Sequence, residues 1–387
     1  MQDIVTPGKL RVCQVCSMHP DDDARVFDRA CVSLAEEGYD VRLVARSAHS
    51  DVYRNKGVRV HPVPKFESRH ARLLGAGRVA RLAAGVNPDI FHVHEPELLS
   101  AVLSVARGRP VIWDVHEPYL DNVATKPWIP LPLRPLVRVI WDRFEKRLVR
   151  RCAAVVVATE WLAPRYDGLH SVVVVVANYP RLRPVPVKPA KPPRRNALVF
   201  TGTMTEDRGL LQTLEAMSIL AARGIPVTFE VAGRPTSAAF LEEFNLAAER
   251  FGVRAQVHYH GYLPRDRALE LQAGCGIGMN NSFPSPGHVK GFPVKMLEFM
   301  NMGLPVIFGD MPNMRRLAGE TGAGLAVDPA SPRQIADAIM RLLADPELAR
   351  RMGEAGKKAV LERFNWEVEW PKLKALYERL LVTRPGG

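Results

Sequence analysis

The stretch LRVCQVCSMHPDDDARVFDRACVSLAEEGYDVRLVA, residues 10–45, decides the fold of the first half of the chain. It opens with an apolar run at 10–16, continues with apolar side chains at helical spacing over 24–37, which Gly38 ends, and closes with a second apolar run at 41–45. An uninterrupted apolar run is typical of a parallel strand that is buried on both faces. Strand, helix and strand in this order form a βαβ unit, and the sequence therefore predicts a doubly wound parallel sheet.

The same alternation of strands and helices continues along the chain, with one interruption. The interruption, PRLRPVPVKPAKPPRR, is rich in Pro, Lys and Arg and predicts a semi-rigid linker. A closing segment places tryptophan, tyrosine and leucine side chains at helical spacing, so one face of that helix should be buried. We therefore expect an α/β protein of two Rossmann-like domains whose last helix crosses back to the first domain: residues 1–180, a linker at 181–195, residues 196–365, and the helix and tail at 366–387.

The composition is that of a folded protein, with 47% hydrophobic and 24% charged residues. The richest apolar run, SVVVVVA at 171–177, has only the length of a strand, and the first residues lack the pattern of a signal peptide, so we expect a cytoplasmic protein. Five cysteines without framework spacing fit a reducing compartment. Cys13 and Cys16 form a C-x-x-C inside an expected strand, where the two side chains point to opposite faces, so no redox role is expected.

The net charge of +12 and the pI near 9.7 favour polyanionic partners, whether nucleic acid, anionic lipid or diphosphate. The sequence has no zinc-finger spacing, no RNP-type aromatic motif and no basic region with heptads, so a nucleic-acid partner is not expected. Residues 131–151 mix apolar side chains with arginine and lysine at helical spacing. Two interpretations remain for this stretch: a solvated surface helix, or a helix that lies on the anionic inner face of a membrane near a lipid-linked acceptor.

Two groups of residues in the second half favour binding of a nucleoside diphosphate. Gly202 and Thr203 follow an expected strand directly, and Arg208 precedes the next helix. A helix N-terminus carries unpaired N–H groups and a partial positive charge, and an arginine adds a bidentate donor for phosphate. The alternative is an exposed arginine without a ligand.

The second group lies in PVKMLEFMNMGLPVI, residues 293–307. Lys295 and Glu298 are three residues apart and should share one face of a helix. Glu298 could accept two ribose hydroxyls while Lys295 neutralises phosphate. The alternative is a surface ion pair worth a few tenths of a kcal/mol.

Together with FTGTMTEDRG and FNWEVEWPKLKALYERL, this motif resembles the donor domain of retaining glycosyltransferases of the GT-B fold, in particular glycosyltransferase family 4 (glycosyl transferases group 1). In the first half, HPDDDARVFDRACVSLAEEGYDVRLVA, PDIFHVHEPELL and PVIWDVHEPY resemble the acceptor-domain landmarks of one subgroup. The resemblance implies two Rossmann-like domains that face a cleft. It also implies transfer of a sugar from a nucleoside-diphosphate donor to a glycan, lipid-linked or small-molecule acceptor, with retention of configuration and without a metal or other cofactor.

The resemblance also implies roles for individual residues. Arg208 matches the residue that holds the donor diphosphate, Glu298 the carboxylate that binds the ribose, and His116 the active-site histidine that contacts the donor sugar. Two positions depart from the family pattern: Thr203 stands where many members carry a second arginine, and Lys290 stands eight residues before Glu298, where the pattern has its first glutamate. We expect Lys295 to replace the lost positive charge. The expected set is catalytic His116, Arg208 and Lys295, with donor-binding Gly202, Thr203, Arg208, Lys290, Gly291, Lys295 and Glu298.

Polar residues also stand at the strand ends of the first half, where open α/β sheets bind their ligands. His94 and His116 each end an expected strand, and we place Asp22, Arg25, His94 and Glu117 on the acceptor side. For an aspartate in the loop before the first helix, capping of that helix is an equal alternative. A metal site is a further alternative that we do not expect; it would use His92, His94, His116 and Glu117.

Two other functions would fit the same architecture. A nucleotide-sugar epimerase can share the GT-B layout and would act without an acceptor. A non-catalytic partner of a polysaccharide assembly complex would bind nucleotide without turnover. None of these motifs specifies the donor base, the sugar, the acceptor, the linkage or the oligomeric state.

Overall fold

A computed structural model describes residues 10–121, 129–182, 193–285, 288–289 and 294–382. It divides into two compact units, described here one at a time. Unit 1 consists of Met1–Asn178 together with Trp366–Gly387, and unit 2 of Tyr179–Asn365.

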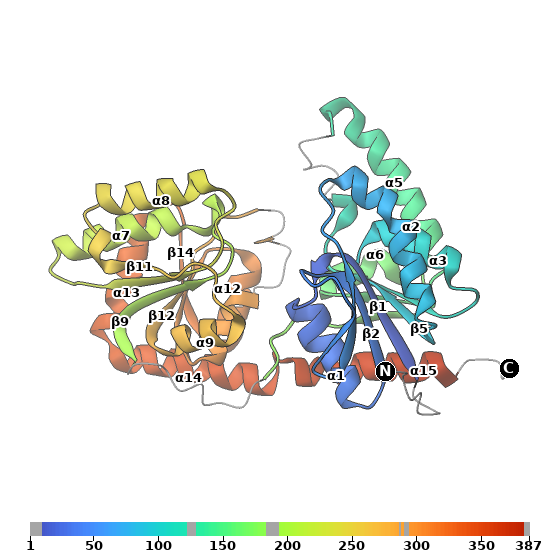
Figure 1. Ribbon diagram of the computed structural model, residues 1–387. Helices are drawn as coiled ribbons and strands as arrows, with labels where there is room; N and C mark the ends of the chain where they lie inside the picture. Colours follow the sequence, from blue (N-terminus) through green and yellow to red (C-terminus); the bar gives the residue numbers. More distant parts are fainter. Residues whose placement is uncertain (1–9, 122–128, 183–192, 286–287, 290–293, 383–387) are drawn as a thin grey trace. The chain divides into compact units, whose positions relative to one another are not determined.

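Unit 1 is built on an eight-stranded sheet of order β3-β4-β2-β1-β5-β6-β7-β8 (Figure 1). Every neighbouring pair in it is parallel except β3 and β4, which form an antiparallel hairpin at the edge. The order reverses direction beside β1, which is the doubly wound topology expected from the sequence. The strands are β1 (Arg11–Pro20), β2 (Asp40–Arg46), β3 (Tyr53–Asn55), β4 (Val58–Val63), β5 (Ile90–Val93), β6 (Val111–Val115), β7 (Ala154–Val157) and β8 (Val173–Val175).

Helices cover both faces of this sheet and bury two separate apolar layers. One layer includes Cys13 and Val15 of β1, and the other includes Val12 and Cys16, so alternate residues of the strand face opposite sides. The two cysteines of the C-x-x-C are therefore apart, as expected. The helices of the first layer are α2 (Arg69–Gly85), α3 (Pro96–Val105), α6 (Ala163–Asp167) and the end of α5 (Arg134–Val149); those of the second are η1 (Ala24–Cys31), α1 (Val32–Glu36) and α15 (Trp366–Val382).

The last helix, α15, completes unit 1, which confirms the expected return of the chain to the first domain. Its buried side chains Trp366, Leu373, Leu376 and Tyr377 join the second apolar layer of the unit-1 sheet. The indole Nε1 of Trp366 donates a hydrogen bond of 2.8 Å to the hydroxyl of Ser33. The helix thus fills a place in the core of a domain whose other elements come from the first half of the sequence.

Unit 2 contains a six-stranded, fully parallel sheet of order β11-β10-β9-β12-β13-β14. Its strands are β9 (Arg194–Thr201), β10 (Thr228–Ala232), β11 (Val257–Tyr259), β12 (Cys275–Asn280), β13 (Val306–Gly309) and β14 (Gly324–Val327). One face packs against α7 (Leu210–Ala222), α8 (Ala238–Arg250) and α13 (Pro332–Ala344). The other packs against α9 (Arg265–Ala273), α11 (Val294–Asn301), α12 (Pro312–Thr321) and α14 (Pro346–Glu362).

Three features differ from the sequence-based expectation. The helix expected at 24–37 begins with a π-helical segment, in which the N–H of Asp28 donates to the carbonyl of Asp23 at 3.1 Å. The expected linker is shorter at its end, because β9 already begins at Arg194 and pairs with β10 and β12; its residues 183–192 lie outside the described residues. Helix α2 was not expected, because its many arginine and glycine residues dilute the apolar periodicity.

Candidate active site

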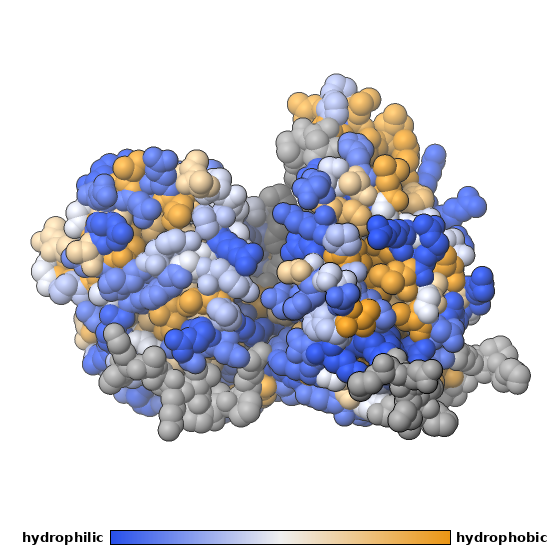
Figure 2. Space-filling model, in the orientation of Figure 1, coloured by the Kyte–Doolittle hydropathy of each residue, from blue (hydrophilic) through white to orange (hydrophobic). Residues whose placement is uncertain are grey.

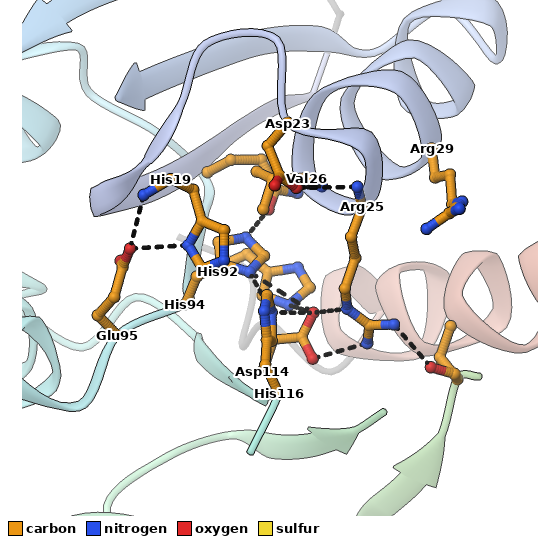
Figure 3. Close-up of polar contacts among 12 residues, drawn as sticks. His19, Asp23, Arg25, Val26, Arg29, His92, His94, Glu95, Asp114 and His116 are labelled. Atoms are coloured by element: carbon orange, nitrogen blue, oxygen red, sulfur yellow. Dashed lines mark hydrogen bonds and ion pairs between the residues drawn. The ribbon is translucent and has the colours of Figure 1, made fainter. Parts of the chain in front are cut away.

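The site in unit 1 is formed by residues of three neighbouring strands, β1, β5 and β6, whose side chains point to the same face of the sheet. Gln14 of β1 is paired in register with His92 of β5, and Val93 of β5 with Trp113 of β6. His94 directly follows β5, and Asp114 lies within β6 at the next position of the same register. Gln14, His92, His94 and Asp114 therefore all face the layer of α1 and α15. The carboxyl ends of the strands therefore gather histidines, a carboxylate and an amide in one place (Figure 3).

Asp114 is the centre of this group, and the dashed contacts in Figure 3 converge on it. Its carboxylate accepts two hydrogen bonds from Arg25, with Nη2–Oδ1 at 2.8 Å and Nε–Oδ2 at 3.2 Å. Oδ2 also lies 3.3 Å from His116 Nε2 and 3.5 Å from His94 Nδ1. Burial alone would raise the pKa of Asp114, but Arg25 and His116 hold it well below its usual value. The carboxylate is therefore ionised at neutral pH.

The histidines differ in their access to solvent. Burial lowers the pKa of His92 to about 4 and that of His94 well below its usual value, so both rings are neutral at pH 7. His94 is fully buried between Gln14 Oε1, at 2.7 Å from Nε2, and His116 Nε2, at 3.1 Å from Nδ1. The side chain of His116 keeps 13% of its surface exposed. Of the three histidines around Asp114, His116 is therefore the one that solvent can reach.

His19, which the sequence analysis did not select, also belongs to this site. Its ring lies 4.9 Å from that of His116, and its Nδ1 is 2.8 Å from Glu95 Oε1. Glu95 also accepts hydrogen bonds from the backbone N–H groups of Ser17, Met18 and His19, at 2.8–3.1 Å, and so fixes the end of β1. Burial would lower the pKa of His19, but the hydrogen bond to Glu95 raises it. The only signal in the sequence was its place in the loop after the first strand.

The acceptor-side residues expected from the sequence have different surroundings. Arg25 is only 6% exposed and donates from Nη1 to the carbonyl of Val176 at 3.0 Å, so its guanidinium is occupied by the protein itself. Asp23 caps the helix η1 and accepts from the N–H groups of Arg25 and Val26 at 2.8 Å each, which is the capping alternative. Asp22 and Glu117 are exposed.

The metal alternative does not fit the residues that come together. In the part of the chain that the structure describes, ligand atoms of His92, His94 and Asp114 lie within 4.8 Å of one another, whereas Glu117 is not in the group. Both oxygens of Asp114, however, already accept from Arg25. A cation here would have to displace a buried guanidinium.

In unit 2, Gly202 directly follows β9, at a position whose backbone favours glycine. Its φ of +142° lies in the region that favours glycine, and a Cβ there would come within 3.2 Å of Lys295 Cε. The carbonyl of Gly202 would in turn lie 1.7 Å from a Cβ at Gly233. The strand end, the neighbouring β10 end and the lysine of α11 are therefore in close contact.

Arg208 lies between this strand end and helix α7. It is partly buried, and its Nε has no hydrogen-bond partner within the described ranges. Burial lowers the pKa of Arg208 against a smaller opposing effect of Asp207, which means that the cation is poorly solvated. Gly209, with φ +69°, begins α7 without a side-chain cap, and its carbonyl accepts from Asn281 Nδ2 at 3.0 Å. A cation and a helix N-terminus thus stand together at the carboxyl edge of the sheet.

The structure describes only some of the other residues that were expected to bind the donor. Lys295 Nζ is 2.8 Å from Glu298 Oε2, so the ion pair that was the alternative interpretation is formed, beside Gly202. Thr203 is exposed. Lys290 and Gly291 lie outside the described residues.

Both halves of the chain match models of known protein families. The model of the family Glycosyltransferase Family 4 matches residues 24–179, and that of Glycosyl transferases group 1 matches residues 184–359. The phosphatidyl-myo-inositol mannosyltransferase of Mycobacterium leprae is 24% identical over 97% of this chain and 98% of that protein. A GDP-mannose-dependent alpha-(1-6)-phosphatidylinositol monomannoside mannosyltransferase of Mycobacterium tuberculosis is 34% identical over 35% of each chain.

Among solved structures, the sucrose-phosphate synthase of Thermosynechococcus elongatus has a TM-score of 0.74 at 15% identity, over 97% of this chain and 100% of that one. This likeness shows the GT-B fold. The comparisons do not favour an epimerase or a non-catalytic partner. Both halves of the chain match models of the same class of enzyme, and the protein belongs to the family 4 (group 1) glycosyltransferases, which transfer a sugar from a nucleotide-sugar donor.

Proposed function

We propose that this enzyme transfers a hexose, with mannose as the first candidate, from a nucleoside diphosphate to a lipid-linked or polyol hydroxyl, with retention of configuration and without a metal ion. The observation that carries the proposal is the state of Arg208, whose Nε is buried without a partner at the N-terminus of α7. Leaving a charged donor unsatisfied costs stability. A diphosphate at this place would satisfy Arg208 and the first N–H groups of α7 together.

The mechanism follows from where charge develops. As the bond to the sugar breaks, negative charge grows on the leaving diphosphate, and Arg208 and Lys295 stabilise it electrostatically. The leaving phosphate takes the proton of the acceptor hydroxyl, which then attacks from the same face. His116 contacts the transferred sugar, the role that the family resemblance gives it.

Two observations support the chemistry without a metal. Asp114, the carboxylate of the histidine group, is neutralised by Arg25 through two hydrogen bonds. Arg208 supplies positive charge for a diphosphate, and Lys295, which is paired with Glu298, lies beside Gly202. The choice of mannose follows the two mycobacterial relatives, which are both mannosyltransferases.

Thermal unfolding with nucleotides tests the donor site. We expect one of UDP, GDP, dTDP, ADP and CMP to raise the unfolding temperature equally in Mg²⁺ and in EDTA. Arg208→Ala should weaken binding of that nucleotide by about 1–3 kcal/mol, or roughly 5- to 150-fold in Kd by titration calorimetry. Arg223→Ala is the matched control, because Arg223 lies in the same unit in a surface ion pair with Asp337 at 2.7 Å. Equal affinity of wild type and Arg208→Ala would contradict the donor site.

A second proposal concerns α5, and it commits to an anionic lipid surface as the partner. Of the sixteen residues of α5, only Glu145, Leu148 and Val149 are buried. Leu136 and Ile140 are each 58% exposed, and arginines at 134, 138, 143 and 147 share the helix. Figure 2 shows apolar side chains gathered over this end of unit 1. An exposed helix with apolar and basic residues is typical of one that lies in a lipid interface. No helix among the described residues is both long enough and apolar enough to span a bilayer.

Vesicle sedimentation tests this contact. We expect the protein to bind vesicles of phosphatidylglycerol and phosphatidylcholine but not of phosphatidylcholine alone, and Leu136→Glu with Ile140→Glu to abolish binding. Leu74→Glu is the control, since Leu74 is 86% exposed on another helix, α2, of the same unit. Binding that survives the double substitution would place the lipid contact elsewhere or remove it.

A further inference from the structure

A hydroxyl group from the C-terminal helix reaches the histidine group of unit 1. Tyr377 of α15 is fully buried, and its Oη lies 2.6 Å from His92 Nδ1 and 2.9 Å from Gln14 Nε2. Gln14 Oε1 lies 2.7 Å from His94 Nε2, and His94 Nδ1 lies 3.1 Å from His116 Nε2. An unbroken series of hydrogen bonds therefore runs from His92 through Tyr377, Gln14 and His94 to His116.

Two arrangements of the protons give every bond in this series a donor and an acceptor and also use the proton of the Tyr377 hydroxyl within it. In the first, Tyr377 donates to His92 Nδ1 and accepts from Gln14, whose Oε1 accepts from His94 Nε2–H. His94 Nδ1 then accepts from His116 Nε2–H. In the second, the amide of Gln14 is turned over so that its oxygen and nitrogen exchange places, every bond is reversed, and His94 Nδ1–H donates to His116 Nε2.

His92 Nε2 decides between the two arrangements. It is buried, has no hydrogen-bond partner within the described residues, and lies 3.7 Å from Asp114 Oδ2. In the first arrangement this nitrogen carries a proton that faces the carboxylate. In the second it presents a lone pair to the same anion, in a buried setting where repulsion is weakly screened. The first arrangement is therefore the stable one.

The tautomer of His94 also determines which nitrogen of His116 carries the proton. With His94 Nδ1 as an acceptor, the Nε2–H of His116 is shared between His94 at 3.1 Å and Asp114 at 3.3 Å. The neutral ring of His116 then keeps its lone pair on Nδ1. A lone pair there accepts a hydrogen bond from a sugar hydroxyl, whereas a proton there would only donate one.

We infer that Tyr377 is a positioning residue of the transferase: through Gln14 and His94 it fixes the tautomer of His116 so that Nδ1 accepts a hydroxyl of the sugar. The inference rests on the proposed role of His116. No other group stands between Gln14 and His92 in this series, so the Tyr377 hydroxyl is the link that couples the two buried histidines.

Nitrogen NMR of the histidine rings tests this directly. In ¹⁵N-histidine-labelled wild type, His92 and His94 should show protonated Nε2 and unprotonated Nδ1. Tyr377→Phe keeps the buried ring but removes the hydroxyl, and we expect mixed tautomers at His94 and His116. Signals are assigned with His92→Asn and His94→Asn. Tyr39→Phe is the control, because its ring lies 6.3 Å from that of Tyr377 and is only partly buried.

Kinetics supply the second measurement. We expect Tyr377→Phe to lower kcat about 10-fold with little change in the KM for the donor, and Tyr39→Phe to change neither. Unchanged tautomers in Tyr377→Phe would overturn the inference, and so would an unchanged kcat despite altered tautomers. If neither wild type nor variant transfers sugar but the tautomers still shift, the proposed function fails while the hydrogen-bond series stands.

Discussion

Each unit carries an arginine soon after the first strand of its sheet, and the two arginines have opposite surroundings. Arg25, in η1 after β1, is buried against Asp114 and Val176. Arg208, in η4 (Glu206–Arg208) after β9, has its Nε buried without a partner among the described residues. The first is used by the fold, and the second is available to a ligand.

The helix starts beside these arginines differ in the same sense. In unit 1, the side chain of Asp23 accepts from the first N–H groups of η1. In unit 2, Gly209 is the N-cap residue of α7, and no side chain of the described residues caps this helix. The two Rossmann-like domains thus differ at corresponding positions. The N-terminus of the helix is capped by a side chain in unit 1, and it has no side-chain cap among the described residues of unit 2.

The largest expected effect is the loss of Arg25. Arg25→Met leaves Asp114 buried without its partner, which should lower the free energy of unfolding of unit 1 by about 3–5 kcal/mol. Urea unfolding followed by tryptophan fluorescence measures this, because all six tryptophans lie in the residues of unit 1. Arg25→Met with Asp114→Asn should recover most of the loss. A loss below about 1 kcal/mol in the single variant would mean that Asp114 has other compensation.

The next effect is a pH dependence of unit 1. His92 and His94 are neutral when folded but take up protons near pH 6.5 when unfolded, so the unfolded state binds more protons between pH 6.5 and about 4. Stability should therefore fall as the pH falls through this range. The raised pKa of His19 opposes the fall only slightly, which leaves a net loss of about 3 kcal/mol between pH 6.5 and 5.

Urea midpoints at pH 7.5, 6 and 5, again followed by tryptophan fluorescence, measure this slope. His92→Gln should flatten it. A profile that is flat in the wild type would show that the buried histidines are already charged in the folded protein.

A smaller loss should follow removal of the cap in unit 1. Asp23→Ala deletes the acceptor for the N–H groups of Arg25 and Val26 and should cost about 1 kcal/mol in the same unfolding experiment. Asp23→Asn is the control, since asparagine caps about as well as aspartate. Equal losses for both variants would point to the charge of Asp23 rather than to the cap.

The smallest effect on stability is expected for the loss of Arg208. Arg208→Met removes a poorly solvated cation, so the unfolding temperature without ligand should stay the same or rise slightly, in contrast to Arg25→Met. Differential scanning calorimetry, which follows both units, measures this. A large fall would mean that Arg208 holds the fold together, and the contrast between the two arginines would be lost.

The strands were predictable because buried parallel strands read as apolar runs. The apolar runs at 10–16 and 41–45 correspond to β1 and β2, and only Leu10 of these runs lies outside the strands. The edge hairpin of β3 and β4 and the helix α2 have no such run, and they were missed. Local pattern therefore identifies the centre of each sheet better than its margin.

The members of the histidine group could be predicted only where a residue stands at the end of its own strand. His94 and His116 were selected because each ends a strand. The ion pair between Arg25 and Asp114 was not predicted, because Asp114 stands 89 positions later in the chain. Asp114 itself could have been found, since it lies two residues before His116 and must share its face of the strand. Tyr377 was recognised as part of an apolar face, but nothing local indicates that its hydroxyl meets Gln14, 363 positions away.

The return of α15 to unit 1 has a consequence for synthesis on the ribosome. The sheet of unit 1 is made before unit 2, whereas the helix that covers its histidine face is made after unit 2. Unit 2, which ends at Asn365, has all its residues before α15 begins at Trp366. Unit 1 is therefore completed only after unit 2, and a nascent chain carries the histidines uncovered until α15 has been made.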